Sequence, residues 1–329
     1  MEPRPIAIVT GGAGFLGSHI SRRLDRTHHV VIIDNMLTGR LENIPGSYHA
    51  GGMTLLQKDV IDAEPNSLFR SLSFLKGTTG KIDVIYNFAC PASPPKYQID
   101  PVHTMMTNVV GTRNMLELAR LTGARVIQAS TSEVYGDPQV HPQTESYRGC
   151  VNPHGPRSCY DEGKRAAEAL CYDYEHKHGV DTRIVRIFNT YGPAMDPEDG
   201  RVVTNFIDQA IRGVDITMYG DGSQTRSFCY VDDLIDGIFR LSEYEGKGCH
   251  EPFNIGNPDE FSVRQLAHLV IEKTASKSRI VYRDLPIDDP TQRCPNITRA
   301  AALLEWKPRV KLDTGLELTI SDVKRRRGL

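Results

Sequence analysis

A tyrosine and a lysine lie four residues apart in the segment YDEGK, as Tyr160 and Lys164. Positions i and i+4 lie on one face of a helix, so the two side chains are expected to be neighbours. A free tyrosine has a pKa of about 10, too high for a good base at neutral pH. We expect the Lys164 ammonium and an oxidised nicotinamide to lower the pKa of Tyr160. Such a pair predicts oxidation of a secondary alcohol.

A second reactive group follows the apolar run RVIQAS (125–130), as the sequence Thr131-Ser132-Glu133. The ends of parallel strands are where α/β proteins bind ligands. The Thr131 hydroxyl is expected to hydrogen-bond the alcohol oxygen. Glu133, with Ser132, is expected to orient a substrate and direct a proton. The alternative is that Glu133 only caps a helix or forms a salt bridge.

The segment IAIVTGGAGFLGSHI predicts a nucleotide site, because Gly11, Gly14 and Gly17 follow a strand and open a helix. Glycines let the backbone approach a pyrophosphate, whose charge the helix N-terminus favours. Asp34, at the end of the next strand, can accept a hydrogen bond from a ribose hydroxyl and would repel a 2′-phosphate. The cofactor is therefore expected to be NAD rather than NADP. Asp59 is expected near the adenine.

Apolar runs alternate with helix-length segments over the first part of the chain. The candidate strands are residues 6–10, 30–34, 53–59, 83–89, 125–130 and 183–189. Strands buried on both faces and separated by helices predict an α/β protein with a Rossmann-like, doubly wound parallel sheet. Later Pro/Gly-rich loops predict a smaller α/β lobe. We assign an NAD-binding domain to 1–190 and an interleaved substrate lobe to 191–329.

The composition is that of a soluble globular enzyme, with 39% hydrophobic and 24% charged residues. A formal net charge of −2 gives no reason to expect nucleic acid or an anionic membrane as partner. Seven cysteines without a CxxC spacing predict reduced thiols, no metal site and a cytoplasmic location. No secretory signal is recognised, and no apolar run approaches the roughly 20 residues that span a bilayer.

The motifs together resemble the extended short-chain dehydrogenase/reductase family, in its nucleotide-sugar branch. The resemblance covers essentially the whole chain and is carried by the segments TGGAGFLG, YDEGK, RIFNTYGP and YGDGSQTRSFCYVDDL. It implies NAD as cofactor and a nucleotide diphosphate sugar as substrate. It also implies a homodimer formed by the helix that bears Tyr160 and the long helix predicted at about 102–122.

Within this branch, the residues after the strand-end threonine distinguish the reactions. Sugar 4,6-dehydratases carry Asp-Glu, because elimination of water needs an acid, and simple 4-epimerases carry no carboxylate. The pair Ser132-Glu133 resembles the UDP-glucuronate decarboxylases, or UDP-xylose synthases, as do the segments FACPASPPKYQIDP, GPRSCYDEGKR and DDPTQRCPNI. The implied reaction oxidises C4 of UDP-glucuronate, loses CO₂ from the resulting β-keto acid and re-reduces C4 with the same NADH.

The resemblance also implies three sets of contacts. The candidate catalytic residues are Thr131, Ser132, Glu133, Tyr160, Lys164 and Arg293. The candidate cofactor-binding residues, besides Tyr160 and Lys164, are Gly11, Gly14, Phe15, Leu16, Gly17, Asp34, Asn35, Thr38, Gly39, Asp59, Val60, Phe88, Ala89, Cys90, Thr107, Ala129, Thr190 and Arg201. The candidate substrate-binding residues are Tyr97, Asn189, Asn205, Tyr219, Arg226 and Arg293, with Arg226 suited to pair a phosphate.

Three positions depart from the family pattern. Cys294 stands in Arg-Cys-Pro where Arg-Lys-Pro is expected, Met106 replaces a lysine, and Ala194 replaces an arginine. The last two changes remove positive charge near an anionic substrate, which predicts a higher KM rather than a different reaction.

Other functions remain open from the sequence. One is a 4-epimerase or 4,6-dehydratase on the same fold. Another is a decarboxylase that releases a UDP-4-keto-pentose together with NADH. A non-catalytic NAD-binding protein would be expected to have lost Tyr160, Lys164 or Glu133, and all three are present.

Overall fold

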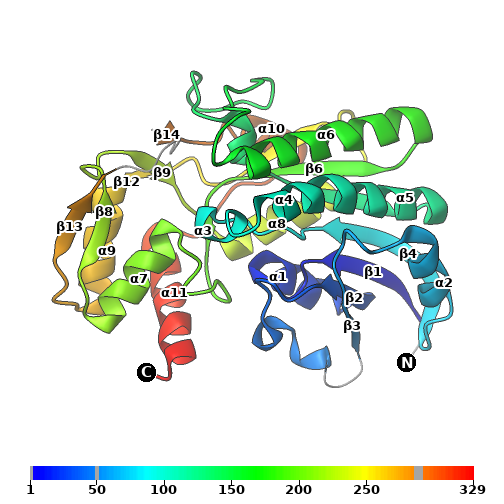
Figure 1. Ribbon diagram of the computed structural model, residues 1–329, viewed down its shortest axis with the longest axis horizontal. Helices are drawn as coiled ribbons and strands as arrows, with labels where there is room; N and C mark the ends of the chain where they lie inside the picture. The colour runs from blue at the N-terminus through cyan, green and yellow to red at the C-terminus, as the bar shows by residue number, and fades with distance from the viewer. Residues whose placement is uncertain (1–2, 49–51, 285–291) are drawn as a thin grey trace.

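The computed structural model describes residues 3–48, 52–284 and 292–329. Part of the segment DDPTQRCPNI, residues 288–291, lies outside the described residues. The larger part of the molecule is built on a seven-stranded parallel sheet in the order β11-β6-β5-β4-β1-β2-β3 (Figure 1). Its strands are β1 (Arg4–Thr10), β2 (His29–Asp34), β3 (Met53–Gln57), β4 (Thr78–Asn87), β5 (Arg125–Thr131), β6 (Thr182–Ile187) and β11 (Pro252–Ile255).

The six predicted strands are confirmed, and their sequences explain why they are central. Alternate residues of β1 enter two different cores: Ala7 and Val9 pack in one, and Ile6 and Ile8 in the other. A strand with apolar side chains on both faces must be covered on both faces, as in a doubly wound sheet. The seventh strand, β11, was not predicted as a strand. It comes from the segment assigned to the smaller lobe.

Helices cover both faces of the sheet. One core includes side chains of α1 and α8, and the other includes side chains of α2, α5 and α6. The helices of the chain are α1 (Phe15–Leu24), α2 (Pro65–Ser73), α3 (Pro94–Tyr97), α4 (Pro101–Met106), α5 (Thr112–Thr122), α6 (Ser158–His178), α7 (Val202–Arg212), α8 (Val231–Glu243), α9 (Val263–Thr274), α10 (Thr298–Leu303) and α11 (Leu312–Arg327).

The single helix expected at about 102–122 is interrupted. A π-helical turn, Thr107–Gly111, joins α4 to α5. Its polar side chains hydrogen-bond backbone carbonyls one turn earlier: Thr107 Oγ1 donates to His103 O (2.8 Å) and Asn108 Nδ2 to Thr104 O (3.0 Å). Such bonds compete with regular helix geometry, and π turns of this kind often occur at functional sites.

The smaller lobe contains short strands in separate small sheets, beside α7, α9 and α11 (Figure 1). The pairs are β7 (Thr190–Tyr191) with β10 (Cys229–Tyr230) and β8 (Ile216–Tyr219) with β13 (Ile280–Arg283), and β9 (Thr225–Ser227) lies between β12 (Glu260–Ser262) and β14 (Gln292–Arg293). Because the chain returns to the main sheet at β11, the two parts are interleaved. The boundary at residue 190 stays a prediction.

Within the described ranges, no helix combines the length and the apolar character needed to pass through a membrane.

Candidate active site

A cavity of about 570 Å³ is lined by loops at the carboxyl ends of the main strands and by residues of the smaller lobe. In the strand order, β1 lies between β4 and β2, so the direction of winding reverses beside it. That switch point is where open parallel sheets bind ligands. Every candidate site residue lines this cavity except Gly39. Gly39 instead packs behind Asp34, since a Cβ on it would lie 2.8 Å from Asp34 Oδ1.

The turn between β1 and α1 accepts only glycine at two positions. Gly11 has φ +69°, and a Cβ there would lie 2.8 Å from the carbonyl oxygen of Phe88. A Cβ on Gly17 would lie only 2.1 Å from Gly11 O. The turn therefore brings the N-terminus of α1 against the end of β1, in the arrangement that holds a pyrophosphate.

Asp34 lies at the end of β2 and is held by the same turn. Its Oδ2 accepts from Ala13 N (2.9 Å) and its Oδ1 from Met36 N (2.9 Å). Burial raises the pKa of Asp34 above its ordinary value, and the two backbone bonds partly oppose that rise. The carboxylate is thus fixed in position to receive the hydroxyls of a ribose. With the glycine turn, it makes this end of the cavity fit NAD.

Asp59 lies beyond β3 in a small polar cluster at the same end of the cavity. Its Oδ2 accepts from Asn35 Nδ2 (2.7 Å) and lies 2.7 Å from His103 Nε2. Burial alone would raise the pKa of Asp59, but bonds from Ile61 N, His103 and Asn35 lower it overall. His103 lines the cavity and was missed from the sequence, because a single histidine on a helix gives no signal of its partner.

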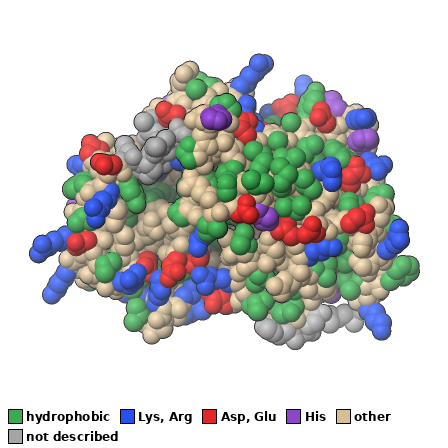
Figure 2. All heavy atoms as spheres, in the orientation of Figure 1, with side chains coloured by type: hydrophobic (Ala, Val, Ile, Leu, Met, Phe, Trp, Pro, Cys, Tyr) green, Lys and Arg blue, Asp and Glu red, His purple; other side chains and the backbone are tan. Residues whose placement is uncertain are grey.

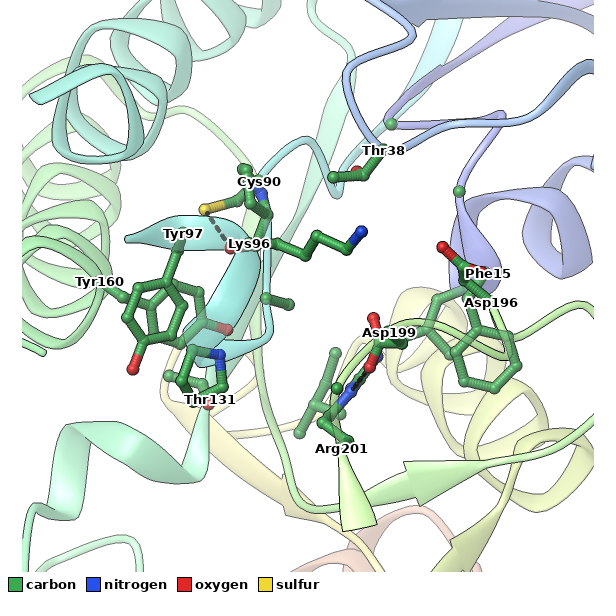
Figure 3. A pocket seen from close by; sticks show the side chains of 18 of the residues that line it. Phe15, Thr38, Cys90, Lys96, Tyr97, Thr131, Tyr160, Asp196, Asp199 and Arg201 are labelled. Atoms are coloured by element: carbon green, nitrogen blue, oxygen red, sulfur yellow. Dashed lines mark hydrogen bonds and ion pairs between the residues drawn. The ribbon is translucent and has the colours of Figure 1, made fainter. Parts of the chain in front are cut away.

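Tyr160, Lys164 and Thr131 meet at the other end of the cavity. The ring of Tyr160 stacks on that of Tyr97, with centroids 5.0 Å apart and planes inclined by 5°. Hydrogen bonding to Thr131 acts to lower the pKa of Tyr160. Lys164 Nζ donates to Ala129 O (3.0 Å) and lies 5.7 Å from the centroid of the Tyr160 ring. Figure 3 shows Tyr160, Tyr97 and Thr131 grouped on one side of the pocket, with Phe15 and Asp196 across from them.

The lowering of the Tyr160 pKa that we expect from Lys164 and an oxidised nicotinamide together stays a prediction, and the chain by itself shows the opposite direction. Burial raises the pKa of Tyr160 above its ordinary value, and the nearby Cys90 adds to the rise. Burial also lowers the pKa of Lys164. The Lys164 ammonium donates to the Ala129 carbonyl and is itself buried. In the chain by itself the raised pKa of Tyr160 therefore favours the neutral phenol.

Glu133 lies between two arginines. Its Oε1 pairs with Arg293 Nη1, and its Oε2 lies 3.1 Å from Arg157 Nη2. Arg293 also donates to Ser132 Oγ (3.3 Å) and to Gly136 O (2.9 Å). Burial alone would raise the pKa of Glu133, but Arg293 and then Arg157 lower it overall, so the carboxylate is ionised. The alternative in which Glu133 forms salt bridges is therefore present in the structure. The alternative in which it caps the helical turn is not, because Thr131 is the cap: its Oγ1 accepts from Glu133 N (3.2 Å).

Two members of this cluster were not predicted from the sequence. Arg157 directly precedes α6 and lines the cavity. Asp161 is buried, and its Oδ1 has no hydrogen-bond partner within the described part of the chain. Burial, and then the charge of Glu133, raises the pKa of Asp161 to about 7. Only the fold brings these groups beside Glu133, since they lie more than 20 residues away from it in the sequence.

The remaining candidate contacts come from the smaller lobe and the loops that lead to it. Asn189, Asn205, Tyr219 and Arg226 all line the cavity. Asn205 Nδ2 donates to Gly200 O (2.9 Å), so the asparagine also fixes the loop before α7. Figure 3 shows Arg201 paired with Asp199 at the floor of the same pocket.

The positions that depart from the family pattern lie in different places. Met106 does not line the cavity, whereas Ala194 does, with φ +71°. Lys96 and Arg40 line the cavity as well, and Lys96 was missed from the sequence. Arg40 is paired with Asp196, which also lines the cavity (2.9 Å), so Lys96 is the one of the two that offsets part of the charge loss expected from Met106 and Ala194.

Comparisons with known proteins agree with this geometry. The model of the NAD dependent epimerase/dehydratase family matches residues 7–256. UDP-glucuronic acid decarboxylase 4 of Arabidopsis thaliana is 50% identical over 97% of this chain and 68% of its own length. UDP-glucuronic acid decarboxylase 1 of Xenopus tropicalis is 47% identical over 97% of this chain and 72% of its own.

A solved structure gives the same fold at lower identity. UDP-glucuronic acid 4-epimerase from Bacillus cereus, in complex with UDP-glucuronic acid and NAD, superposes with a TM-score of 0.85. It is 26% identical and covers 98% of this chain and 99% of its own. The fold is thus shared with epimerases, while the much higher identity is to decarboxylases. The chain belongs to the NAD dependent epimerase/dehydratase family and, within it, to the UDP-glucuronic acid decarboxylases.

Proposed function

We propose that this chain is an NAD-dependent UDP-glucuronate decarboxylase, which releases CO₂ and forms UDP-xylose through a UDP-4-keto-hexuronate. The observation that carries the proposal is the ionised Glu133 held between Arg293 and Arg157, in one cavity with Tyr160 and the glycine turn. A single carboxylate paired with arginines suits a reaction that handles a second, substrate carboxylate and eliminates no water.

The first proton transfer involves Tyr160 and Thr131. Thr131 hydrogen-bonds the C4 oxygen of the sugar, and the phenolate of Tyr160 takes the hydroxyl proton. Bound NAD supplies the acceptor for the C4 hydride, the donor that returns it, and a positive charge that favours the phenolate. In the last step Tyr160 gives the proton back to the C4 oxygen.

The arginines and Glu133 act on the carboxylate of the sugar. Once C4 is a ketone, loss of CO₂ moves the negative charge from the carboxylate to the C4 oxygen, beside Thr131 and Tyr160. Arg293 and Arg157 balance the charge of Glu133 and that of the substrate before CO₂ leaves. Because Glu133 is ionised, it accepts hydrogen bonds, and it orients a water that passes a proton from solvent to C5.

The competing reactions fit these residues less well. A 4,6-dehydratase needs an acid where this chain has Ser132, and a simple 4-epimerase has no use for Glu133 and its arginines. Early release of the 4-keto-pentose depends on how tightly the cavity closes, and the test below distinguishes it.

The test is incubation of the purified protein with UDP-glucuronate and no added cofactor, following CO₂, UDP-pentose and NADH together. We expect CO₂ and UDP-xylose in equal amounts, without accumulation of NADH. CO₂ with one equivalent of NADH would mean that the 4-keto-pentose is released. Binding of UDP-glucuronate without any CO₂ would overturn the assignment and favour the epimerase or dehydratase.

We also infer that the protein is a homodimer. Apolar side chains of α4 and its neighbours are exposed: Ile99 by 74%, Val102 by 70%, Met106 by 37% and Tyr172 of α6 by 59%. Figure 2 shows hydrophobic side chains gathered on the face where Figure 1 places α4 and α6. A second copy on this face would bury them, and would explain a methionine rather than a lysine at position 106. Analytical ultracentrifugation should find a dimer that Val102→Glu converts to a monomer, and a monomeric wild-type protein would contradict this.

A cytoplasmic location is proposed on the state of the cysteines. All seven are free, which is typical of a reducing compartment. Fractionation of the native cells with an antibody against the protein would test this, and recovery from a secretory compartment would contradict it.

A further inference from the structure

Three potential metal ligands meet outside the active site. They are His141 in the loop before α6, Glu260 in β12 and Cys294 directly after β14. Their ligand atoms all lie within 4.8 Å of one another, and His141 Nε2 is 2.9 Å from Glu260 Oε2. The proposed catalytic reaction uses none of the three side chains.

The backbone holds the three residues in place. Gln143, which is fully buried, donates its N–H to Cys294 O (2.9 Å) and accepts from Cys294 N at its side-chain oxygen (2.9 Å). Glu260 Oε1 accepts from Thr225 Oγ1 (2.8 Å), and β12 and β14 both pair with β9 (Figure 1). A buried hydrogen bond therefore holds the backbone at Cys294, and strand pairing with an exposed hydrogen bond holds Glu260.

We infer that His141, Glu260 and Cys294 form a binding site for one divalent cation of the zinc type. Imidazole, carboxylate and thiolate are the three ligand classes that zinc takes, and three protein ligands leave a fourth position for water. The thiolate argues against magnesium and calcium, which prefer oxygen. This inference is independent of the proposed function.

The rearrangement needed for binding is small. Tetrahedral zinc with bonds of about 2.0–2.3 Å places its ligand atoms roughly 3.3–3.8 Å apart. The His141–Glu260 contact must therefore open slightly and Cys294 Sγ must approach by up to about 1.3 Å. His141 and Glu260 have room to move, since their side chains are 30% and 29% exposed.

Besides the His141–Glu260 hydrogen bond, binding also changes a hydrogen bond of Cys294. Cys294 Sγ now donates to Pro258 O (3.3 Å), and coordination as thiolate would release that proton to solvent. The cation would join the loop of His141 to the backbone next to Arg293, the partner of Glu133. It would thus restrain the segment that carries an active-site arginine.

The test is titration of the chelator-treated full chain with Co²⁺, read by absorption. We expect one equivalent to bind, with a sulfur-to-cobalt charge-transfer band and the intense visible bands of a tetrahedral site, and Zn²⁺ to displace it. Cys294→Ser should lose the charge-transfer band. Cys294→Ser and His141→Gln should each weaken binding by at least about 100-fold, since even outer-shell partners are worth 10–100-fold.

The controls use the same residue types elsewhere. Cys150→Ser and His268→Gln, at exposed positions, should leave the titration unchanged. If Cys294→Ser does not fold, as judged by circular dichroism, His141→Gln and Glu260→Gln take its place, because both alter exposed side chains. Absence of a charge-transfer band in the wild-type protein, or a titration that His141→Gln and Glu260→Gln leave unchanged, would overturn the inference.

Discussion

At the nucleotide end of the cavity, the glycine turn and Asp34 come from a single stretch of chain around β1, α1 and β2, and the turn is packed backbone against backbone. At the reaction end, Glu133, Arg157 and Arg293 come from three separate segments and act through their charges. The first end is defined by how close atoms approach one another. The second is defined by which charges are buried together.

This difference predicts different failures. An added methyl group at the glycine turn has no space, because the nearest atoms are backbone and move little. A removed charge at the reaction end leaves a buried charge without its counter-charge, which costs about 3–5 kcal/mol in typical buried pairs. The cofactor end should be sensitive to volume and the reaction end to charge.

The largest effect is expected from Gly17→Ala at the nucleotide end. Its Cβ would lie 2.1 Å from Gly11 O, so the turn must open. We expect NAD affinity, measured by calorimetric titration, to fall by at least about 100-fold, or about 2.7 kcal/mol, with the activity falling alike. Gly46→Ala is the matched control, because a Cβ there would meet no atom within 4 Å. Unchanged NAD affinity in Gly17→Ala would contradict a sterically defined site.

Glu133→Gln should impair the reaction end of the cavity and leave the nucleotide end unaffected. It keeps the size of the side chain and removes the charge that pairs with Arg293 and Arg157. We expect CO₂ release to fall by about 100-fold or more, in the range typical of a lost acid–base or orienting group, with NAD affinity unchanged. Glu162→Gln, which alters a surface pair with Arg165 on the same helix, should retain full turnover. Full turnover in Glu133→Gln would refute its role.

Asp161→Asn tests whether the raised pKa of Asp161 makes the free energy of unfolding depend on pH. Folding raises the pKa of Asp161 to about 7, whereas an unfolded aspartic acid ionises at about 4. The folded state therefore holds the extra proton between these values, and its stabilising contribution is present at low pH and lost as pH rises through this window. We expect the free energy of unfolding of the variant, measured by urea denaturation, to rise relative to that of the wild type by on the order of 2–4 kcal/mol between pH 4 and pH 8.

The same measurement in a Glu133→Gln background sharpens the result. Without the charge of Glu133, the pKa of Asp161 should fall. The stability that Asp161→Asn gains over its parent as the pH rises should then be smaller. An equal gain in both backgrounds would show that burial alone, and not Glu133, sets this pKa.

The smallest effect is expected from Ala194→Gly. Ala194 lines the cavity with φ +71°, a conformation that costs an L-residue about 1–2 kcal/mol, while glycine adopts it freely. After the entropy that glycine loses on folding, a gain of up to about 1 kcal/mol in stability is expected from chemical denaturation. Ala301→Gly, within α10, should instead destabilise by about 1 kcal/mol. A destabilised Ala194→Gly would show that the alanine methyl group packs favourably.

The sequence alone was sufficient for the central strands, the glycine turn, Asp34 at the end of β2 and the Tyr160–Lys164 pair. These features depend on periodicity and on neighbours a few residues away, which a single segment already contains. The return of the chain through β11 was not visible, because it depends on pairing with β6. The break at Thr107–Gly111 was not visible either, because its local side-chain bonds do not disturb the helical periodicity of the sequence.

Only the tertiary structure decided which charges meet. Arg293 and Glu133 are 160 residues apart, and His141 and Glu260 are 119 apart, so neither pair has a local pattern. The absence of a CxxC spacing predicted no metal site, although ligands from three separate segments converge around Cys294. The raised pKa values of Tyr160 and Asp161 follow from burial. Desolvation and charge pairing depend on distances in space, which only the folded chain defines.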